Sequence, residues 1–285
     1  MEDILNCVFQ VIENYRTKVH YAGATNHIVK RVKALTKNTK PNPQKLFVIE
    51  GIWAFNMAFK ANLEFLDFIV CPECIFSKEA LELAQKAAEA AKSIHVVSKK
   101  VLEKISERDK PDGLIAISKL PEVSLQSINT KNAIIVILDA VEIPGNIGTI
   151  LRSCDGANID AVFICNKRAR LTHPKIVKGS MGAVFFMPII VFESVTECKA
   201  WLSKNGFTIY LADTRAEKLY CNYTYKNNTA LVVGSERYGI TKEWYQDDPK
   251  LIAIPMMGKC DSLNVAIATT VVIYEMRLKK LFKRI

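Results

Sequence analysis

Several common sequence features are missing from this chain, and each absence narrows what the protein can be. No apolar run in its 285 residues is long enough for a membrane-spanning helix. The first ten residues, MEDILNCVFQ, lack a basic start followed by an apolar core, so we expect no signal peptide. The glycine-containing segments match neither G-x-G-x-x-G nor a P-loop, the usual dinucleotide and triphosphate motifs. We therefore expect a cytoplasmic protein with no membrane partner.

Histidine is scarce, and cysteine shows no metal-binding pattern. The four histidines, at positions 20, 27, 95 and 173, stand isolated in the sequence. Cys71 and Cys74 have the spacing of a ligand pair, but a structural zinc site would need a second pair or well-spaced histidines. The sequence therefore predicts no metal, and the eight cysteines are expected to be reduced and mostly buried.

Acidic residues are absent from Arg16 to Lys45, a segment that holds eight Lys or Arg residues. The whole chain has 39 Lys and Arg against 29 Asp and Glu, a formal charge of +10. Such blocks are typical of phosphate-binding surfaces, although a solvated helix face followed by a loop is the alternative. The missing acids favour phosphate binding, with Lys30, Arg31 and Lys33 on adjacent turns if the segment is helical.

Strands and helices alternate along both halves of the chain. In the first half, LFVIE, LDFIVC, SIHVVS and DGLIAIS have strand patterns with helical segments between them, one of which Ser77 can cap. This alternation predicts a small α/β domain over residues 1–118. Residues 119–132 contain proline and polar residues without strong periodicity and are expected to be a linker.

Residues 133–285 repeat the alternation with more apolar strands. The segments AIIVILDA, AVFIC, FTIYLAD, ALVVG and LIAIP are continuous apolar runs separated by helical intervals. Such runs predict a parallel sheet covered on both faces. Ligands of these sheets bind beyond the carboxyl ends of the strands, so polar clusters directly after strands are candidate sites.

The first cluster is VEIPGNIGTILRSCDGAN, which follows the strand ending at Asp139. Gly148 permits close backbone approach, and Asn146 and Arg152 could face one crevice. The alternative is that Asn146 caps a helix and Arg152 forms a structural salt bridge. The second cluster is LVVGSERYGI, where Gly234 and Gly239 flank Glu236 and let the backbone pass close to a ligand.

The third cluster, Asp261 to Asn264, precedes the apolar run VAIATTVVI. This run is rich in β-branched residues, but we expect a helix because it continues into YEMRLKK, with basic residues in its last turns. Asp261 or Ser262 can cap that helix. Asn264 would lie inside the first turn, where asparagine is a poor helix former, and is interpreted as a site residue. The helix is apolar on nearly all sides, which predicts burial in the core or against another subunit.

Together and in this order, the three clusters resemble the motifs of the SpoU (TrmH) branch of the SPOUT RNA methyltransferases. They match Asn-x-Gly followed by Arg, then Gly-x-Glu-x-x-Gly, then Ile-Pro-Met through Ser-Leu-Asn-Val. The resemblance covers roughly residues 133–280, including KGSMGAVFFMPI between the first two motifs. Through FVIEGIWAF and KPDGLIAI, the N-terminal half is similar to the family's ribosomal-protein-like RNA-binding domain. The layout is similar to antibiotic-resistance ribosomal RNA methyltransferases.

The resemblance implies a fold and a reaction. The fold is α/β, with a C-terminal parallel sheet that carries a deep trefoil knot and a small N-terminal RNA-binding domain. The methyl donor is S-adenosyl-L-methionine, bound bent against the knot, and the product is a 2′-O-methylated ribose in structured RNA, here ribosomal RNA. A homodimer through the C-terminal domain is implied, without metal. The alternatives are a tRNA 2′-O-methyltransferase and a non-catalytic RNA-binding or ribosome-assembly protein that kept the knot.

The resemblance also implies roles for single residues. The catalytic set is Arg152, Asn146, Glu236, Ser262 and Asn264. The cofactor-binding set is Leu211, Ala212, Gly234, Ile254, Met256 and Leu263, with Pro255 to Lys259 lining the bent donor. The RNA-binding set is Lys30, Arg31, Lys33 and Lys178.

Three positions of the first motif, Arg152, Thr149 and Cys154, bear on the chemistry. The family's counterpart of Arg152 is the proposed base, although a guanidinium keeps its proton in proteins. Two roles therefore stay open for Arg152: a base assisted by substrate phosphate, or a cation that stabilises the forming alkoxide. Thr149 and Cys154 stand where alanines are usual in the first motif. We expect Cys154 to pack and not to act as a nucleophile, because this chemistry needs no covalent enzyme intermediate.

Overall fold

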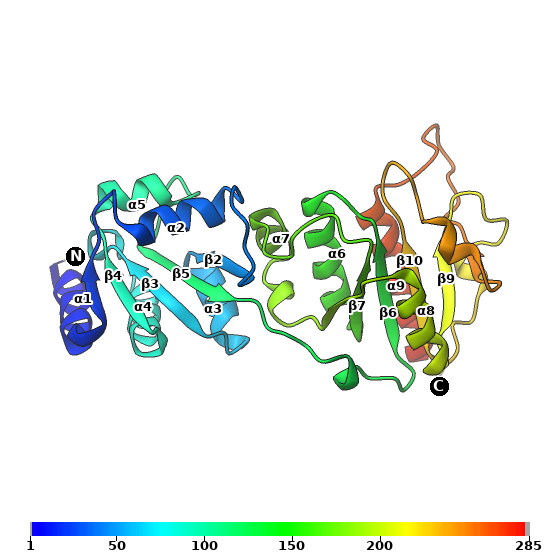
Figure 1. The fold of residues 1–285 in the computed structure, drawn as a ribbon, viewed down its shortest axis with the longest axis horizontal. Coiled ribbons are helices and arrows are strands. Elements are labelled where there is room, and N and C mark those ends of the chain that lie inside the picture. Colours follow the sequence, from blue (N-terminus) through cyan, green and yellow to red (C-terminus); the bar gives the residue numbers. More distant parts are fainter. Residues whose placement is uncertain (1, 283–285) are drawn as a thin grey trace. The chain divides into compact units, whose positions relative to one another are not determined.

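The computed structural model describes residues 2–282, which divide into two compact units (Figure 1). The first unit takes in the described residues up to Pro121 together with Thr172–Pro174. The second consists of Glu122–Leu171 and the described residues from Lys175 onward. In the described part of the chain, no helix is long and apolar enough to cross a membrane.

The first unit contains a five-stranded mixed sheet in the order β1-β4-β3-β5-β2. Strands β1, β4 and β3 run parallel, and β5 is antiparallel to both β3 and β2. The strands are β1 (Val19–Tyr21), β2 (Leu46–Glu50), β3 (Phe65–Val70), β4 (Ser93–Val96) and β5 (Leu114–Lys119). The helices are α1 (Glu2–Asn14), α2 (His27–Thr36), α3 (Ile52–Lys60), α4 (Lys78–Ala90) and α5 (Lys99–Ile105).

Local capping explains where two of these helices begin. The Ser77 hydroxyl accepts a hydrogen bond from the Ala80 amide at 3.1 Å, so the predicted cap of α4 is confirmed. Asn26 caps α2 in the same way, accepting from the Ile28 amide at 3.0 Å. The sequence pattern predicts neither α1 nor β1, since β1 is a three-residue edge strand without an apolar run of its own.

The second unit contains a six-stranded sheet in the order β11-β9-β10-β6-β7-β8, and every pairing in it is parallel. The predicted parallel sheet is therefore confirmed. Its strands are β6 (Ile134–Asp139), β7 (Ala161–Cys165), β8 (Ile189–Val191), β9 (Thr208–Ala212), β10 (Thr229–Val233) and β11 (Lys250–Ile252). Only β8 was not expected, again a short edge strand. The helices are α6 (Pro144–Gly156), α7 (Pro174–Gly179), α8 (Val195–Lys204) and α9 (Val265–Phe282).

Apolar side chains cover both faces of this sheet. Ile135 and Ile137 of β6 belong to the same buried cluster as Cys198 and Leu202 of α8. Because side chains alternate along a strand, the intervening residues of β6 face the other side. That side is covered by α6 and α9, which pack against each other.

Helix α9 forms where the sequence predicts a helix, but it is not buried on all sides. Its residues Ala266, Val272 and Met276 are buried, whereas Ile267 is 50% exposed and Phe282 is 67% exposed. Of the two predicted alternatives, burial in the core therefore accounts for only one side of α9. One face of the helix packs on the core, and the other face exposes apolar side chains. Burial of that outer face against a second subunit stays a prediction.

Candidate active site

The segments that carry the three motifs meet at the carboxyl ends of the strands in the second unit. Asn146 donates a hydrogen bond through Nδ2 to Oε1 of Glu236, and Asn264 donates through Nδ2 to Oδ1 of Asn146 at 3.2 Å. These residues are 90 and 118 positions apart in the chain. A continuous amide–carboxylate chain therefore joins α6, the turn after β10 and the start of α9.

A buried aspartate helps to fix this end of the sheet. Asp139, the last residue of β6, is fully buried, and its carboxylate accepts from Nδ2 of Asn166 at 2.8 Å and from the Thr241 amide at 2.7 Å. It thereby ties the segments that follow β7 and β10 to the end of β6. The sequence gives this residue no functional signal, because its partners are 27 and 102 positions away.

The first motif lies in the first turns of α6. The predicted cap role of Asn146 does not apply, because the residue before the helix is Ile143 and Asn146 lies inside it. A Cβ on Gly148 would come within 2.9 Å of the Ile176 carbonyl oxygen and 3.0 Å of the Ser180 amide nitrogen. The predicted close backbone approach at Gly148 is therefore confirmed.

Arg152 lies further along α6, with its side chain exposed. Among the residues that the structure describes, it forms no ion pair or hydrogen bond, so the alternative of a structural salt bridge does not hold. It is also not among the residues that line the pocket described below. The chain thus brings Asn146, Glu236 and Asn264 together but leaves Arg152 free and outside that group.

The second motif forms a tight turn after β10, closed by two backbone hydrogen bonds between the same pair of residues. The Ser235 amide donates to the Gly239 carbonyl at 3.0 Å, and the Gly239 amide donates back at 2.9 Å. A Cβ on Gly234 would come within 2.2 Å of the Gly239 carbonyl carbon, and Gly239 has a φ of +72°. Both glycines are therefore required by the turn, which sets the position of Glu236 beside Asn146.

The third motif corrects the interpretation of Asn264. This residue is itself the N-cap of α9: its Oδ1 accepts from the Ala266 amide at 2.9 Å, and its carbonyl accepts from the Ala268 amide. The expectation that it lies inside the first turn, with Asp261 or Ser262 as the cap, is wrong. Ser262 is exposed, and among residues 2–282 its one hydrogen-bond partner is its neighbour Asp261, at 3.2 Å.

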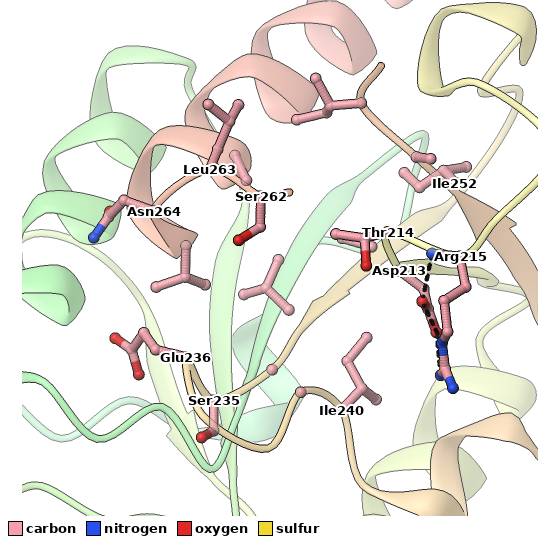
Figure 2. Close-up of a pocket in the computed structure, with 18 of the residues that line it drawn as sticks. Asp213, Thr214, Arg215, Ser235, Glu236, Ile240, Ile252, Ser262, Leu263 and Asn264 are labelled. Atoms are coloured by element: carbon pink, nitrogen blue, oxygen red, sulfur yellow. Dashed lines mark hydrogen bonds and ion pairs between the residues drawn. The ribbon is translucent and has the colours of Figure 1, made fainter. Parts of the chain in front are cut away.

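A pocket of about 730 Å³ opens beside these residues (Figure 2). Segments after β9, β10 and β11 and the start of α9 line it. Of the predicted cofactor-binding residues, five line this pocket: Ala212, Gly234, Ile254, Met256 and Leu263. Leu211 does not, because its side chain is fully buried in the core behind it. Within Pro255 to Lys259, only Met256 lines the pocket.

The pocket also contains a charged cluster that the sequence did not reveal. Asp213 accepts hydrogen bonds from Nε and Nη2 of Arg215 at 3.0 and 2.8 Å and from the Tyr245 hydroxyl at 2.5 Å, and Figure 2 shows the paired Asp213 and Arg215. Arg215 and Tyr245 hold the pKa of the Asp213 carboxyl well below its usual range. Burial, reinforced by the Asp213 carboxylate, raises the pKa of Tyr245 to about 12. The cluster braces the loop after β9.

The predicted phosphate-binding residues of the first unit lie on α2. Lys30 is exposed, whereas Arg31 donates through Nη1 to Oδ2 of Asp67 at 3.1 Å. Although the segment around Arg31 contains no acidic residue, Asp67 of β3 therefore pairs with Arg31. In the second unit, Lys178 is exposed on α7.

Three of the four histidines lie close together in space, although they stand apart in the sequence. The rings of His20 and His27 lie 5.6 and 6.2 Å from that of His95, and His95 bonds Asp67 at 3.0 Å through Nε2. Even so, no group of three or more His, Cys, Asp or Glu residues in the described part of the chain could hold a metal ion.

Most of the cysteines are buried, as expected. Cys71, Cys74, Cys154, Cys165 and Cys198 are buried, and all eight cysteines are free thiols. Burial raises the pKa of the Cys154 thiol far above its usual value. A buried neutral thiol is a poor nucleophile, which agrees with a packing role at that position.

Known proteins match both units. Residues 133–274 match the SpoU rRNA Methylase family, and residues 26–116 match the family described as MRM3-like substrate binding domain. The chain is 25% identical over 258 residues to the 23S rRNA (guanosine(2553)-2′-O)-methyltransferase RlmP of Bacillus subtilis (strain 168), covering 90% of this chain and 98% of that protein.

Two further matches differ in their extent. The 23S rRNA (guanosine-2′-O-)-methyltransferase RlmB of Xanthomonas axonopodis pv. citri is 32% identical over 143 residues, 50% of this chain and 57% of that protein. The crystal structure of an AdoMet-bound rRNA methyltransferase from Sinorhizobium meliloti superposes with a TM-score of 0.81 at 26% identity, covering 92% of this chain and 98% of that one. Hydrogen bonds join the three motif segments beside one pocket, as a shared site requires. On the match over residues 133–274, the chain belongs to the SpoU rRNA methylase family.

Proposed function

We propose that the protein transfers a methyl group from S-adenosyl-L-methionine to a ribose 2′-hydroxyl in ribosomal RNA. The observation that carries this proposal is the convergence of Asn146, Glu236 and Asn264 beside a pocket of about 730 Å³. This volume falls within the range of about 300–1,000 Å³ that is typical of small-molecule and cofactor sites. The matched relatives are named as 23S rRNA 2′-O-methyltransferases.

The lining of the pocket fits this donor. Ile252, Ile254 and Val272 offer an apolar surface for an adenine ring, and the close turn at Gly234 exposes backbone to a ligand. The backbone segments after β9, β10 and β11 can supply hydrogen bonds to the ribose and amino-acid parts. When bound, S-adenosyl-L-methionine supplies a methyl group already activated by its sulfonium sulfur.

The chain's own residues must then orient the ribose and assist loss of its proton. We assign orientation to Asn146, Ser262 and Asn264, with Glu236 holding Asn146 in place. Arg152 carries an exposed charge without an acidic partner in the described residues. Because a guanidinium keeps its proton, we assign Arg152 the role of stabilising the forming alkoxide. The proton goes to solvent as the oxygen–methyl bond forms and the sulfur–methyl bond breaks.

The same proposal covers organisation and partners. We assign residues 1–118 to RNA binding, through Lys30, Arg31 and Lys33, residues 119–132 to a linker, and residues 133–285 to a knotted methyltransferase domain to which Lys178 adds an RNA contact. The support for a trefoil knot in this domain is its membership of the SpoU family. The protein is proposed to be cytoplasmic.

A homodimer through α9 completes the proposed assembly. Its support is the outer face of α9, where Ile267, Leu278 and Leu281 are 50%, 42% and 56% exposed. Arg152 lies on α6, which packs against α9, but it does not line the pocket of its own chain. We therefore propose that Arg152 serves the partner's pocket.

The function is tested by methyl transfer from labelled donor to RNA taken from cells that lack the protein. Ribosomal RNA and tRNA are assayed separately, and the product is digested to nucleosides to locate the methyl group. The expected result is a 2′-O-methylated nucleoside in ribosomal RNA, lost in Arg152→Ala with folding intact. Lys204→Ala, which removes an exposed charge from α8, is the matched control. Methylation of a base, methylation of tRNA alone, or no transfer would each overturn the proposal.

The partner role of Arg152 is tested by mixing two inactive variants. Arg152→Ala keeps the pocket, and Gly234→Val destroys it because even a Cβ at Gly234 meets the Gly239 backbone. If Arg152 acts in the partner's pocket, a mixed dimer contains one complete site and activity returns. If Arg152 acts within its own chain, the mixture stays inactive.

A further inference from the structure

Tyr238 is a large aromatic side chain displayed at the mouth of the pocket. It is 71% exposed and lines the pocket together with Glu236 and Asn264. Its hydroxyl makes no hydrogen bond within the described residues. The other tyrosine of the pocket, Tyr245, is by contrast tied to Asp213. The ring of Tyr238 therefore contributes little to the core, and its exposure needs another explanation.

The backbone beneath Tyr238 is held firmly. Ser235 and Gly239 exchange two backbone hydrogen bonds at 3.0 and 2.9 Å. The Ser235 hydroxyl accepts from the amides of Arg237 and Tyr238, each at 3.3 Å. A side chain on a fixed turn loses little conformational entropy when it binds a partner. The turn thus presents positions 237 and 238 to solvent in a defined place.

The neighbouring residue adds a positive charge to this ring. The guanidinium carbon of Arg237 lies 5.1 Å from the centroid of the Tyr238 ring, and Arg237 forms no ion pair in the described part of the chain. An exposed aromatic ring beside an unpaired guanidinium matches an unstacked base flanked by a phosphate. These two residues occupy the variable positions of the Gly-x-Glu-x-x-Gly motif, so the motif itself does not require them.

We propose that Tyr238 is a stacking platform for a base of the substrate RNA, and that Arg237 contacts the adjacent phosphate. The proposal rests on the proposed function, since it supposes that a ribose is brought to the pocket beside Asn264. A ribose inside structured RNA reaches a pocket only if its nucleotide leaves the stack. The Tyr238 ring then replaces the stacking that the displaced base has lost. The buried wall of the pocket, which includes Val233 and Ile252, would hold the donor instead.

The test compares Tyr238→Ala with Tyr238→Phe, which keeps the ring. The probe is ribosomal RNA from cells lacking the protein, and three quantities are measured: Kd and KM for this RNA, and Kd for S-adenosyl-L-methionine by calorimetry. Tyr238→Ala is expected to raise the RNA Kd by about 5- to 150-fold, the range that stacking of one base on an aromatic ring spans. Tyr238→Phe should stay within about twofold of wild type, and donor affinity should not change in either variant.

Arg237→Ala separates the charge from the ring. Removing one phosphate contact should lower the slope of log K against log salt by about 1, whereas Tyr238→Ala should leave the slope unchanged. An unchanged RNA Kd in Tyr238→Ala would overturn the proposal. So would weaker donor binding, which would place the ring in the donor site, or a loss of dimer in sedimentation, which would make it a subunit contact. Failure of the proposed function is distinct, because wild-type protein itself would then bind no donor or methylate no RNA.

Discussion

Asn264 has two separate contacts, and substitution can remove one without the other. Its Oδ1 caps α9 by accepting from the Ala266 amide at 2.9 Å, and its Nδ2 donates to Asn146 at 3.2 Å. Asn264→Ala removes both contacts. Asn264→Ser keeps a capping oxygen but has no amide that reaches Asn146. The pair therefore distinguishes a residue that only starts a helix from one that also orders the site.

The expected magnitudes follow from these contacts. Loss of an N-cap side chain costs about 1 kcal/mol of unfolding free energy, and loss of a neutral hydrogen bond costs about 1 kcal/mol, less at an exposed site such as this. Asn264→Ala should therefore lose about 2 kcal/mol. Asn264→Ser should lose about 0.5–1 kcal/mol, since only the bond to Asn146 is gone. For a unit of this size the alanine variant should melt about 4–8 °C lower than wild type.

The assay combines urea unfolding with methyl transfer to RNA. Both variants should lose activity to a similar degree, because both remove one of the two side-chain contacts of Asn146 and leave only its bond to Glu236, although their stabilities differ. Donor affinity, measured by calorimetry, should change little in Asn264→Ser. If the serine variant were fully active, the amide bond would have no part in the site. If it were as unstable as the alanine variant, the capping geometry would be wrong.

Three further predictions concern packing, ionisation and a buried amine. Gly148→Ala should lower the free energy of unfolding in urea by about 1–3 kcal/mol, because the new Cβ would lie 2.9 Å from a backbone oxygen. Gly145→Ala is the control: its Cβ would have no atom within 4 Å, so the change should be neutral or stabilising by up to about 1 kcal/mol. The raised pKa of Tyr245 means that its stabilising contribution is complete below about pH 10 and is lost as the pH rises through about 12. Unfolding at stepped alkaline pH should show this loss, and Tyr245→Phe should abolish it. The lowered pKa of Asp213 makes its contribution complete above about pH 4, so stability from this cluster should stay flat between about pH 5 and 9. Lys280→Met should lower the free energy of unfolding by about 3 kcal/mol or more in the same assay. The reason is that the Lys280 amine donates to three main-chain carbonyl oxygens, two of them at 3.0 and 3.1 Å, which the methionine would leave unpaired. A loss below about 1 kcal/mol would contradict this prediction.

The parts of the fold with strong local patterns could be predicted from the sequence. Continuous apolar runs located β6 and β10, and the basic last turns of α9 favoured a helix over a strand. The edge strands β1 and β8 were missed, because three residues are too few for a periodic signal. Short edge strands are determined by the neighbour with which they pair, and that neighbour is distant in the sequence.

The site could be predicted only where it is built from motifs. The resemblance puts Asn146 and Glu236 in one catalytic set, and in the structure a hydrogen bond joins their side chains. The Asp213–Arg215–Tyr245 cluster could not be found this way, because an aspartate two residues before an arginine is common and Tyr245 lies 32 positions from its carboxylate partner. The start of α9 was placed two or three residues too early, because Asp261 or Ser262 was expected to be the cap that Asn264 in fact provides. That error gave Asn264 a role in the site but no role as a cap.

The exposure of the site residues is itself informative about the second substrate. One wall of the pocket is formed by buried residues such as Val233 and Ile252, whereas Glu236, Ser262 and Asn264, which also line it, are exposed. Transfer to a weakly nucleophilic hydroxyl benefits from exclusion of water, and in the described chain the polar side lacks such a cover. A small acceptor could not provide it, but a folded RNA could, since its own surface closes over the open side as the ribose enters. We infer that the site is built as one half of an enclosure, with the macromolecular substrate as the other half.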